Sequence, residues 1–283
     1  MSKTTRNIII VALIVVGGLI GGLAALWLSG GDGSQSQSAA DAVATADAVR
    51  AQAEAVATEV VEAATEVVEQ AEAVATEAVE IVEAMPTEEA VAEASAPAGE
   101  PVTFTIVGAE SSARFELDED LSGNRITVVG TTQGDEDIAG ELVVNAADPS
   151  ASSVGTLAIN VRSLQTDSQF RDRAIRSQIL RSADDANEFA IFTPTALNNM
   201  PASVAVGESF TFELVGDLTL QSTTNPVTFQ VTVTPVSETR LEGSAEAIIL
   251  RGDFGLTIPS VPSVANVEEE VLLAIDFVAE AAE

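Results

Sequence analysis

The sequence of 283 residues contains no cysteine, no histidine and no tyrosine. Without cysteine, the chain can form no disulfide and offers no thiolate as nucleophile or ligand. Without histidine, it lacks the commonest general base and the commonest transition-metal ligand. Lys3 is the only lysine, and it lies at the N-terminus. The many serines of the rest of the chain therefore have no histidine or lysine nearby that could activate one of them as a nucleophile. We therefore expect no catalytic residues, no metal site and no enzymatic activity.

Basic and aromatic residues are also scarce. The chain has 12 Lys and Arg against 44 Asp and Glu, a formal net charge of −32, and only 4% aromatic residues. Such a chain repels nucleic acid and anionic headgroups over most of its surface. It also offers few rings on which bases could stack. We therefore exclude nucleic acid as a partner.

One long uncharged run lies near the N-terminus. Ile8 to Leu28 is 21 residues long, and as a helix it would span about 31 Å, close to the hydrocarbon thickness of a bilayer. Lys3 and Arg6 precede it, which favours a cytoplasmic N-terminus and a C-terminal domain outside the cytoplasm, periplasmic or at the cell surface. We predict that residues 1–33 form a cytoplasmic tip and a single-pass anchor in the cell membrane. The alternative is a cleaved signal peptide, whose apolar region is usually only about 7–15 residues long.

Residues 34–101 have the composition of an acidic stalk or linker. Ala39 to Met85 consists almost wholly of Ala, Val, Glu and Thr, and Ala53 to Glu62 recurs nearly unchanged as Ala71 to Glu80, 18 residues later. This offset equals five helical turns, but glutamates with few basic partners repel one another. Three alternatives remain: a disordered tether, a helical monomer, and a self-associating helix that would form a homodimer. The glycines of the anchor offer a second route to a homodimer.

From residue 102 onward the pattern changes to a period of two, which is typical of strands. The clearest case is Phe210 to Val233, where apolar and polar residues alternate on both sides of Asn225-Pro226. This pattern predicts a long antiparallel hairpin whose turn lies in the polar segment Gln221 to Pro226, which carries the turn signal Asn225-Pro226. Several further short strands and one helix argue for a closed antiparallel barrel or a sandwich in residues 102–283.

The one predicted helix covers about residues 167–181. Thr166 and Gln169 have the spacing of a capping box, and Asp172 and Arg176 have the spacing of an ion pair on one helix face. We expect its apolar face to contain Phe170, Ala174 and Ile179.

The only basic concentration of the domain lies on and just before this helix. It holds five of the nine arginines after residue 101, namely Arg162, Arg171, Arg173, Arg176 and Arg181. Arg171, Arg173 and Arg176 are candidates to contact a phosphate or an anionic headgroup. The alternative is ion pairing with acidic loops such as residues 135–137.

Several short segments follow one another through the domain in a characteristic order. They are Ser111-Ser112 before Arg114-Phe115, Val154 to Val161, Ser163 to Asp167 leading into Arg171-Asp172, Phe189 to Phe192, Gly216 to Leu220 with Thr224 to Val227, and Arg251 to Gly255. This series resembles the YceI-like, polyisoprenoid-binding domain family over nearly all of residues 102–283. The resemblance implies an all-β fold, an extended antiparallel lipocalin-like β-barrel with one short α-helix. It also implies an apolar lumen able to hold a polyisoprenoid or an isoprenoid quinone, and a protein of the periplasm or cell exterior.

The alternating pattern itself predicts which residues face the lumen. The inward set is aliphatic and Phe, without a charge to orient a polar ligand, and such a cavity accepts an apolar chain. We therefore predict a membrane-anchored, extracytoplasmic module that carries or sequesters an apolar lipid, without another cofactor. The alternative is a stalk-displayed structural or interaction module with a filled core. The lumen candidates are Phe210, Phe212, Leu214, Val227, Phe229, Val231, Leu273, Ile275 and Phe277.

Overall fold

The structure is a computed structural model that describes residues 37–75 and 101–282, with the side chains of 59–75 outside the description. The predicted anchor, residues 8–28, lies outside these ranges, as do residues 76–100 of the predicted stalk. Within the described residues, no helix combines the length and the apolar character that a membrane span requires. The strands and the first turns of the stalk helix belong to one compact unit.

The stalk contains a long helix, α2 (Ala39–Ala75), of 37 residues. Its start is capped by Ser38, whose hydroxyl oxygen accepts a hydrogen bond from the backbone N–H of Asp41 at 3.2 Å. Arg50 and Glu54 form an ion pair at 2.9 Å, one turn apart. The sequence left a disordered tether, a helical monomer and a self-associating helix open, and the structure has a helix over these residues. Self-association through this helix stays a prediction.

The first turns of α2 pack against the sheet inside that compact unit. Ala39 and Ala42 are buried together with Ala158, and the backbone N–H of Ala39 donates to the carbonyl of Glu136 at 3.2 Å. The hydroxyl of Thr156 donates to the carboxylate of Asp47 at 2.5 Å. Because alanine side chains are small, the helix backbone comes close to the strands.

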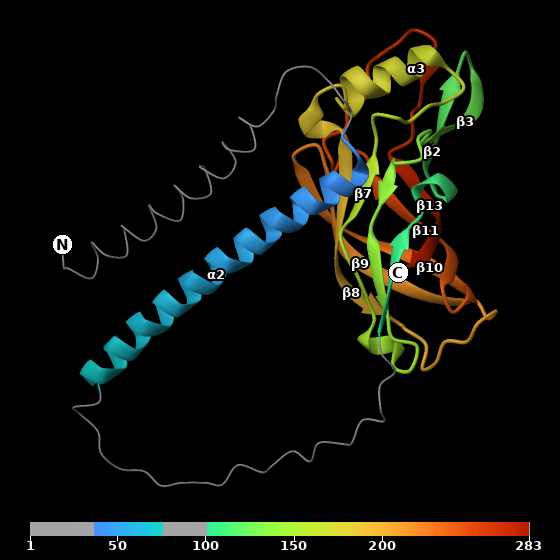
Figure 1. Cartoon of the computed structure of the whole chain (residues 1–283). Helices are drawn as coiled ribbons and strands as arrows, with labels where there is room; N and C mark the ends of the chain where they lie inside the picture. Colours follow the sequence, from blue (N-terminus) through green and yellow to red (C-terminus); the bar gives the residue numbers. More distant parts are fainter. Residues whose placement is uncertain (1–36, 76–100, 283) are drawn as a thin grey trace, which may run out of the picture. The chain divides into compact units, whose positions relative to one another are not determined.

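Thirteen strands within the described residues form one antiparallel sheet (Figure 1). They are β1 (Val102–Ile106), β2 (Ser112–Leu121), β3 (Asn124–Thr131), β4 (Ile138–Ala139), β5 (Glu141–Val144), β6 (Ser153–Val154), β7 (Leu157–Asn160), β8 (Phe189–Asn198), β9 (Phe210–Leu220), β10 (Thr223–Ser237), β11 (Arg240–Leu250), β12 (Val264–Ala265) and β13 (Glu270–Ala281). The main path runs β4-β7-β8-β9-β10-β11-β13-β1-β5-β6, and β2 joins it by pairing with β13 and β3.

The sheet curls into a half-barrel because its distant strands are linked by short bridges. Gly140 separates β4, which pairs with β7, from β5, which pairs with β1. The carbonyl of Gly140 itself accepts a hydrogen bond from Ile106 N–H at 3.0 Å. At the other end, Thr131 and Gln165 exchange two backbone hydrogen bonds of 3.0 Å. One apolar core therefore lies inside the curl.

Two inward-facing glycines allow the sheet to bend tightly. A Cβ atom at Gly243 would lie 2.6 Å from Cζ of Phe277 on the paired strand, and one at Gly216 would lie 2.5 Å from the carbonyl oxygen of Thr193. Side chains at these positions would force strands or rings apart. Glycine under an aromatic ring is a known device for sheet curvature.

The long hairpin is present, with the predicted alternation of buried and exposed residues along β10. The turn lies in the predicted polar segment, but at its start and not at the turn signal Asn225-Pro226. The turn consists of Gln221 and Ser222, and Asn225 and Pro226 lie inside β10, opposite Leu218 and Asp217 of β9. Gln221 has a φ of 55°, as two-residue hairpin loops often require. Pro226 lies outside the part of β10 that pairs with β11, which covers only residues 230–237. A proline is tolerated there because its missing backbone N–H removes no hydrogen bond to β11.

The helix that lies across one end of the sheet is shorter than predicted (Figure 1). It consists of α3 (Gln169–Ala174) and a π-helical turn, Ile175–Ile179. The predicted capping box is absent, because Thr166 instead donates to the carboxylate of Asp172 through both its backbone N–H and its hydroxyl, each at 2.7 Å. The predicted pair of Asp172 with Arg176 is likewise absent, since Arg176 donates to the carbonyl of Arg162 at 3.1 Å.

Candidate functional site

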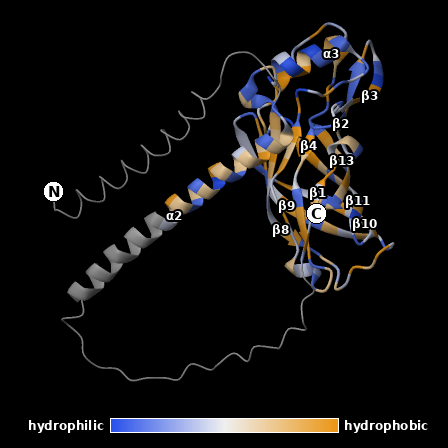
Figure 2. Cartoon of the chain, in the orientation of Figure 1, coloured by the Kyte–Doolittle hydropathy of each residue, from blue (hydrophilic) through white to orange (hydrophobic). Residues whose placement is uncertain are grey.

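A large cavity, here called the main cavity, lies between the inner face of the sheet, α3 and residues 256–267, with a volume of about 600 Å³. Its walls are mostly apolar and come mainly from β2, β7 to β11 and β13, with one residue each from β3 and β12. Figure 2 shows hydrophobic residues along the strands, whereas α3 at this end is largely hydrophilic. Phe170 of α3 lines the cavity although its exposure is 84%. The mouth of the cavity is therefore at the α3 end.

Strand β2 supplies one wall through its alternating residues. Ala113, Phe115, Leu117 and Leu121 face the cavity, and so does Glu119, which has only 6% of its surface exposed. Our prediction that the lumen carries no charge was therefore wrong at this position. The sequence contains the signal, because Glu119 falls on the same face as Ala113 by the period of two.

An arginine from α3 neutralises this carboxylate. Arg171 forms an ion pair with Glu119 at 3.0 Å and a second one with Asp167. The pair joins α3 to β2 across the mouth of the cavity. A buried carboxylate is costly unless it is paired and hydrogen-bonded, so the sequence needs a cation at this point.

The arginine-rich segment divides between the two predicted roles. Of the three candidates for headgroup contact, Arg171 lines the main cavity, whereas Arg173 and Arg176 do not. Ion pairing accounts for much of the segment, but with other acids than the predicted residues 135–137. Arg162 pairs with Asp185 at 2.8 Å and with Glu188 at 3.1 Å.

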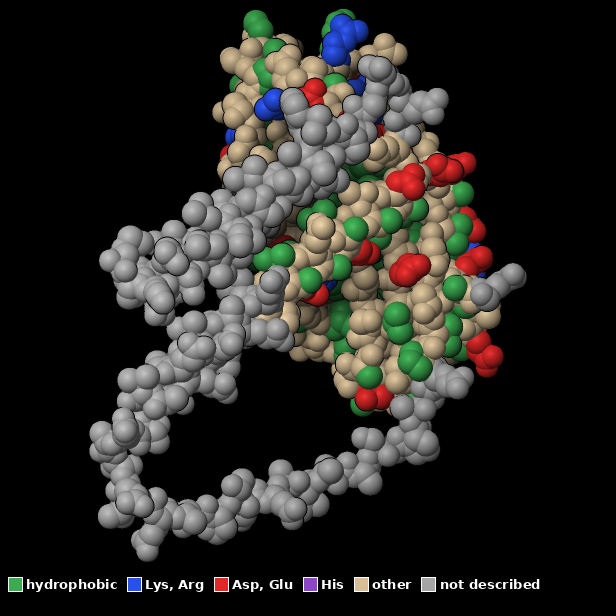
Figure 3. Space-filling view, turned by 60° about the vertical axis from the view of Figure 1, so that its left-hand side comes forward, with side chains coloured by type: hydrophobic (Ala, Val, Ile, Leu, Met, Phe, Trp, Pro, Cys, Tyr) green, Lys and Arg blue, Asp and Glu red, His purple; other side chains and the backbone are tan. Residues whose placement is uncertain are grey.

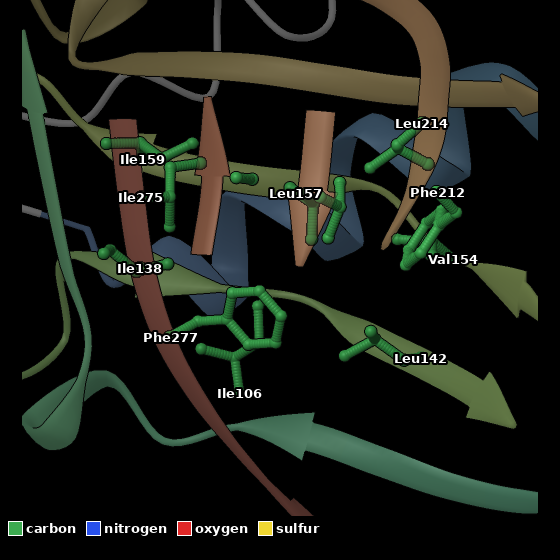
Figure 4. A pocket seen from close by; sticks show the side chains of 12 residues that line it. Ile106, Ile138, Leu142, Val154, Leu157, Ile159, Phe212, Leu214, Ile275 and Phe277 are labelled. Atoms are coloured by element: carbon green, nitrogen blue, oxygen red, sulfur yellow. The ribbon is translucent and has the colours of Figure 1, made fainter. Parts of the chain in front are cut away.

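A second and much smaller cavity, the inner cavity, lies deeper in the curl, with a volume of about 40 Å³ (Figure 4). In Figure 4, Ile106, Phe277, Ile138 and Leu142 surround one side of it and Phe212 and Val154 the other. Its lining contains only apolar side chains. The residues that line both cavities, and so form the wall between them, are Leu157, Ile159, Leu214, Ala245 and Ile275.

All nine predicted lumen residues lie in the core or packed against it, but they differ in what they line. Leu214, Phe229, Leu273 and Ile275 line the main cavity. Phe212, Leu214, Val231, Ile275 and Phe277 line the inner one. Phe210 and Val227 line neither: Phe210 stacks on Phe212 with ring centroids 6.1 Å apart, and Val227 is buried in the core. The ligand contacts of all nine stay a prediction.

The sequence did not reveal the parts of the site that come from irregular segments. Leu256, Ile258, Pro259 and Val261 line the main cavity from the loop after β11. That loop has no alternation from which an inward face could be read. On β9 and β10 the alternation was clear, and Phe229 was correctly placed inside; its ring meets Phe192 edge to face at 5.1 Å.

Comparison with known proteins gives one family match. The sequence profile of the YceI-like domain matches residues 104–279. No curated protein matches the chain.

Several solved structures are similar to the chain at low identity. A polyisoprenoid binding domain from Saccharophagus degradans, implicated in plant cell wall breakdown, is 18% identical, with a TM-score of 0.48 over 64% of this chain and 99% of its own. BcnA from Burkholderia cenocepacia is 16% identical, with a TM-score of 0.46 over 61% and 98%. The YCEI protein of Campylobacter jejuni is 16% identical, with a TM-score of 0.42 over 52% and 83%.

Proposed function

The chain belongs to the YceI-like domain family, and from this premise we propose that its main cavity holds the apolar chain of an isoprenoid-like lipid. The observation that carries the proposal is the cavity itself. Its volume of about 600 Å³ lies within the range of small-molecule sites, and its walls are mostly apolar. The isoprenoid character of the ligand is what the family resemblance implies.

The distribution of polar groups gives the lipid a direction. Glu119, Arg171 and Asp167 lie at the α3 end, whereas the wall toward the inner cavity is apolar. The polar end of the ligand therefore lies at the mouth and the chain points toward Leu214 and Ile275. Burial of the chain supplies the affinity, at about 0.8 kcal/mol for each methylene group removed from water.

The curled sheet then acts as a lipocalin-like barrel, a container for a carrier or a sequestering protein without catalytic activity. We further propose that residues 8–28 anchor it in the cell membrane with the barrel outside the cytoplasm. The uncharged run and the preceding Lys3 and Arg6 support this placement.

The alternative, a structural module with a filled core, fits the structure less well. A filled core would need side chains in the space of the main cavity, and native interiors leave few voids larger than a water molecule. A cavity of about 600 Å³ is far beyond that size.

The proposal is tested with the purified full chain in detergent. Organic extraction followed by mass spectrometry should recover an isoprenoid lipid. Delipidated protein reloaded with an isoprenoid alcohol should gain about 2.7 kcal/mol of stability at a hundredfold excess over the dissociation constant. No recovered lipid, together with identical melting of the two forms, would support the filled core.

A cavity-filling variant sharpens the test. Ala245 is buried and lines both cavities, so Ala245→Phe should occupy part of the lumen. We expect it to fold and to bind the alcohol much more weakly. Thr228→Phe, on the exposed side of β10, is the matched control and should bind as the natural protein does. Unchanged binding by folded Ala245→Phe would show that the ligand lies elsewhere.

A further inference from the structure

The mouth of the main cavity carries exposed apolar side chains. Phe170 and Val261 both line the cavity, yet they are 84% and 44% exposed. They belong to different segments, α3 and the loop after β11, so two separate segments contribute to the apolar rim. A large aromatic ring in water is unfavourable, and an apolar patch beside an apolar cavity commonly marks an interaction surface.

The charge of the segment around α3 also differs from that of the whole chain. Four arginines lie between residues 171 and 181 of a chain with a net charge of −32. Among the described residues, Arg173 is exposed and makes no ion pair, and Arg181 is exposed with a carboxylate no closer than 3.9 Å. The basic side chains visible in Figure 3 lie mainly at the end that carries α3 in Figure 1.

Apolar side chains next to exposed cations match the surface of a lipid bilayer. The apolar groups enter the boundary between headgroups and acyl chains, and the cations contact phosphate groups. A soluble protein partner would equally accept the apolar rim, but a bilayer is also the source of the ligand. A chain that leaves a bilayer through water must expose every methylene group, whereas transfer through a docked mouth avoids this exposure.

We propose that the rim formed by α3 and residues 256–267 docks on a lipid bilayer, with Phe170 and Val261 inserted, and that lipid passes between the bilayer and the main cavity through this contact. The inference rests on the proposed function, because it assigns the route by which the ligand reaches its cavity.

Insertion can be measured because the chain has no cysteine. Phe170→Cys and Val261→Cys give single labelling sites for an environment-sensitive fluorophore in the full chain, reconstituted in vesicles of phosphatidylcholine and phosphatidylglycerol. Ile248→Cys is the matched control, since Ile248 is 65% exposed on β11 and lines neither cavity. We expect brominated lipids to quench the labels at 170 and 261 and to spare the label at 248. Equal quenching at all three sites, or none at 170 and 261, would overturn the proposal.

The route is tested separately from binding. Phe170→Ser should slow the loading of a fluorescent isoprenoid alcohol from vesicles by about tenfold, because a serine inserts no apolar surface. Because Phe170 also lines the cavity, the affinity of Phe170→Ser for the same alcohol is measured separately in detergent, and the loading rate from vesicles should fall by more than that affinity does. Phe170→Leu keeps an apolar side chain and Ile248 lines neither cavity, so Phe170→Leu and Ile248→Ser should load at the natural rate. Equal loading by Phe170→Ser would refute the docking route. A loss of binding by every form in detergent would instead refute the proposed function.

The labelled variants also test for a different occupant of the rim. A label at 170 that responds to protein concentration in detergent, but not to brominated lipid, would place a second copy of the chain on the rim and exclude the bilayer.

Discussion

At the scale of single residues, Glu119 and Arg171 determine how α3 is held over the main cavity. Their side chains are 8% and 17% exposed and their charged atoms are 3.0 Å apart. Removing one member of such a pair leaves the other charge poorly compensated, which costs more than the intact pair contributes. Here Asp167 remains as a second partner of Arg171 and softens the loss.

We therefore expect Glu119→Leu to lower the free energy of unfolding by about 1–3 kcal/mol. The double variant with Arg171→Met should be less destabilised than the sum of the two single variants, because the unpaired charge is then gone. Urea unfolding of the four forms measures this coupling. Arg173→Met, a neighbouring exposed arginine without an ion pair among the described residues, is the control and should change stability by no more than about 0.5 kcal/mol. An unchanged free energy of unfolding in Glu119→Leu would show that the ion pair does not hold α3.

The sequence predicts inward positions better than it predicts contact with a cavity. The alternation of β10 places both Val227 and Phe229 inside, as the structure has them, because the period of two is a property of the strand. Only Phe229 lines the main cavity. Which inward side chain meets empty space depends on the packing of several strands, which no single strand encodes.

At the scale of elements, four strands set the depth of the main cavity. β7 supplies Leu157 and Ile159, β9 supplies Leu214 and β13 supplies Ile275 to the wall before the inner cavity (Figure 4). β11 (Arg240–Leu250) adds Ala245. Because these side chains are apolar and come from separate strands, shortening one of them should open the wall without breaking a hydrogen bond.

Leu214→Ala should join the two cavities and let the protein accept longer chains. We expect the ratio of affinities for a long and a short isoprenoid alcohol to rise, and stability to fall by about 2–5 kcal/mol from the lost packing. Competition binding with alcohols of increasing length measures the ratio. Val227→Ala removes buried volume that borders neither cavity, so it should lose stability with an unchanged length preference. An unchanged preference in Leu214→Ala would mean that the wall does not limit the chain.

Element boundaries were where sequence reasoning failed most. Asn225-Pro226 has the composition of a turn, yet the register of β9 and β10 places the turn at Gln221, because tertiary pairing overrides a local signal. The helix was predicted to run to about residue 181, but α3 ends at Ala174 and a π-helical turn follows. Phe170 was assigned to the packed face from its spacing, whereas it is exposed at the mouth.

At the scale of the whole molecule, basic residues are few and single arginines contact several carboxylates. Arg240 alone contacts Glu110, Glu242 and Glu280 on the outside of the sheet. Its hydrogen bond to Glu110 lowers the pKa of that carboxyl below its usual value of 4.5.

The class of fold and the family could be predicted from strand patterns and motif order. The docking of Ala39 and Ala42 on Ala158 could not, because alanines in a low-complexity helix carry no sign of their partner.

This arrangement predicts how stability depends on pH. Because the pKa of Glu110 is lower in the folded state than in the unfolded state, its contribution is present above about pH 4.5 and is lost as the pH falls through the folded pKa. Protonation at low pH also relieves the repulsion within a chain of net charge −32, but this effect is nearly the same in a variant that differs by one charge.

The difference between the natural protein and Arg240→Gln therefore isolates the contact. We expect the natural protein to be more stable than Arg240→Gln at pH 7, and the difference to shrink as the pH falls through the lowered pKa of Glu110 in the folded protein. Urea unfolding at a series of pH values measures it. Arg173→Gln loses a charge that makes no ion pair among the described residues. Its free energy of unfolding should therefore differ from that of the natural protein by the same amount at every pH. A difference for Arg240→Gln that is constant over the whole series would show that Arg240 acts through packing of its aliphatic part, because that contribution does not titrate.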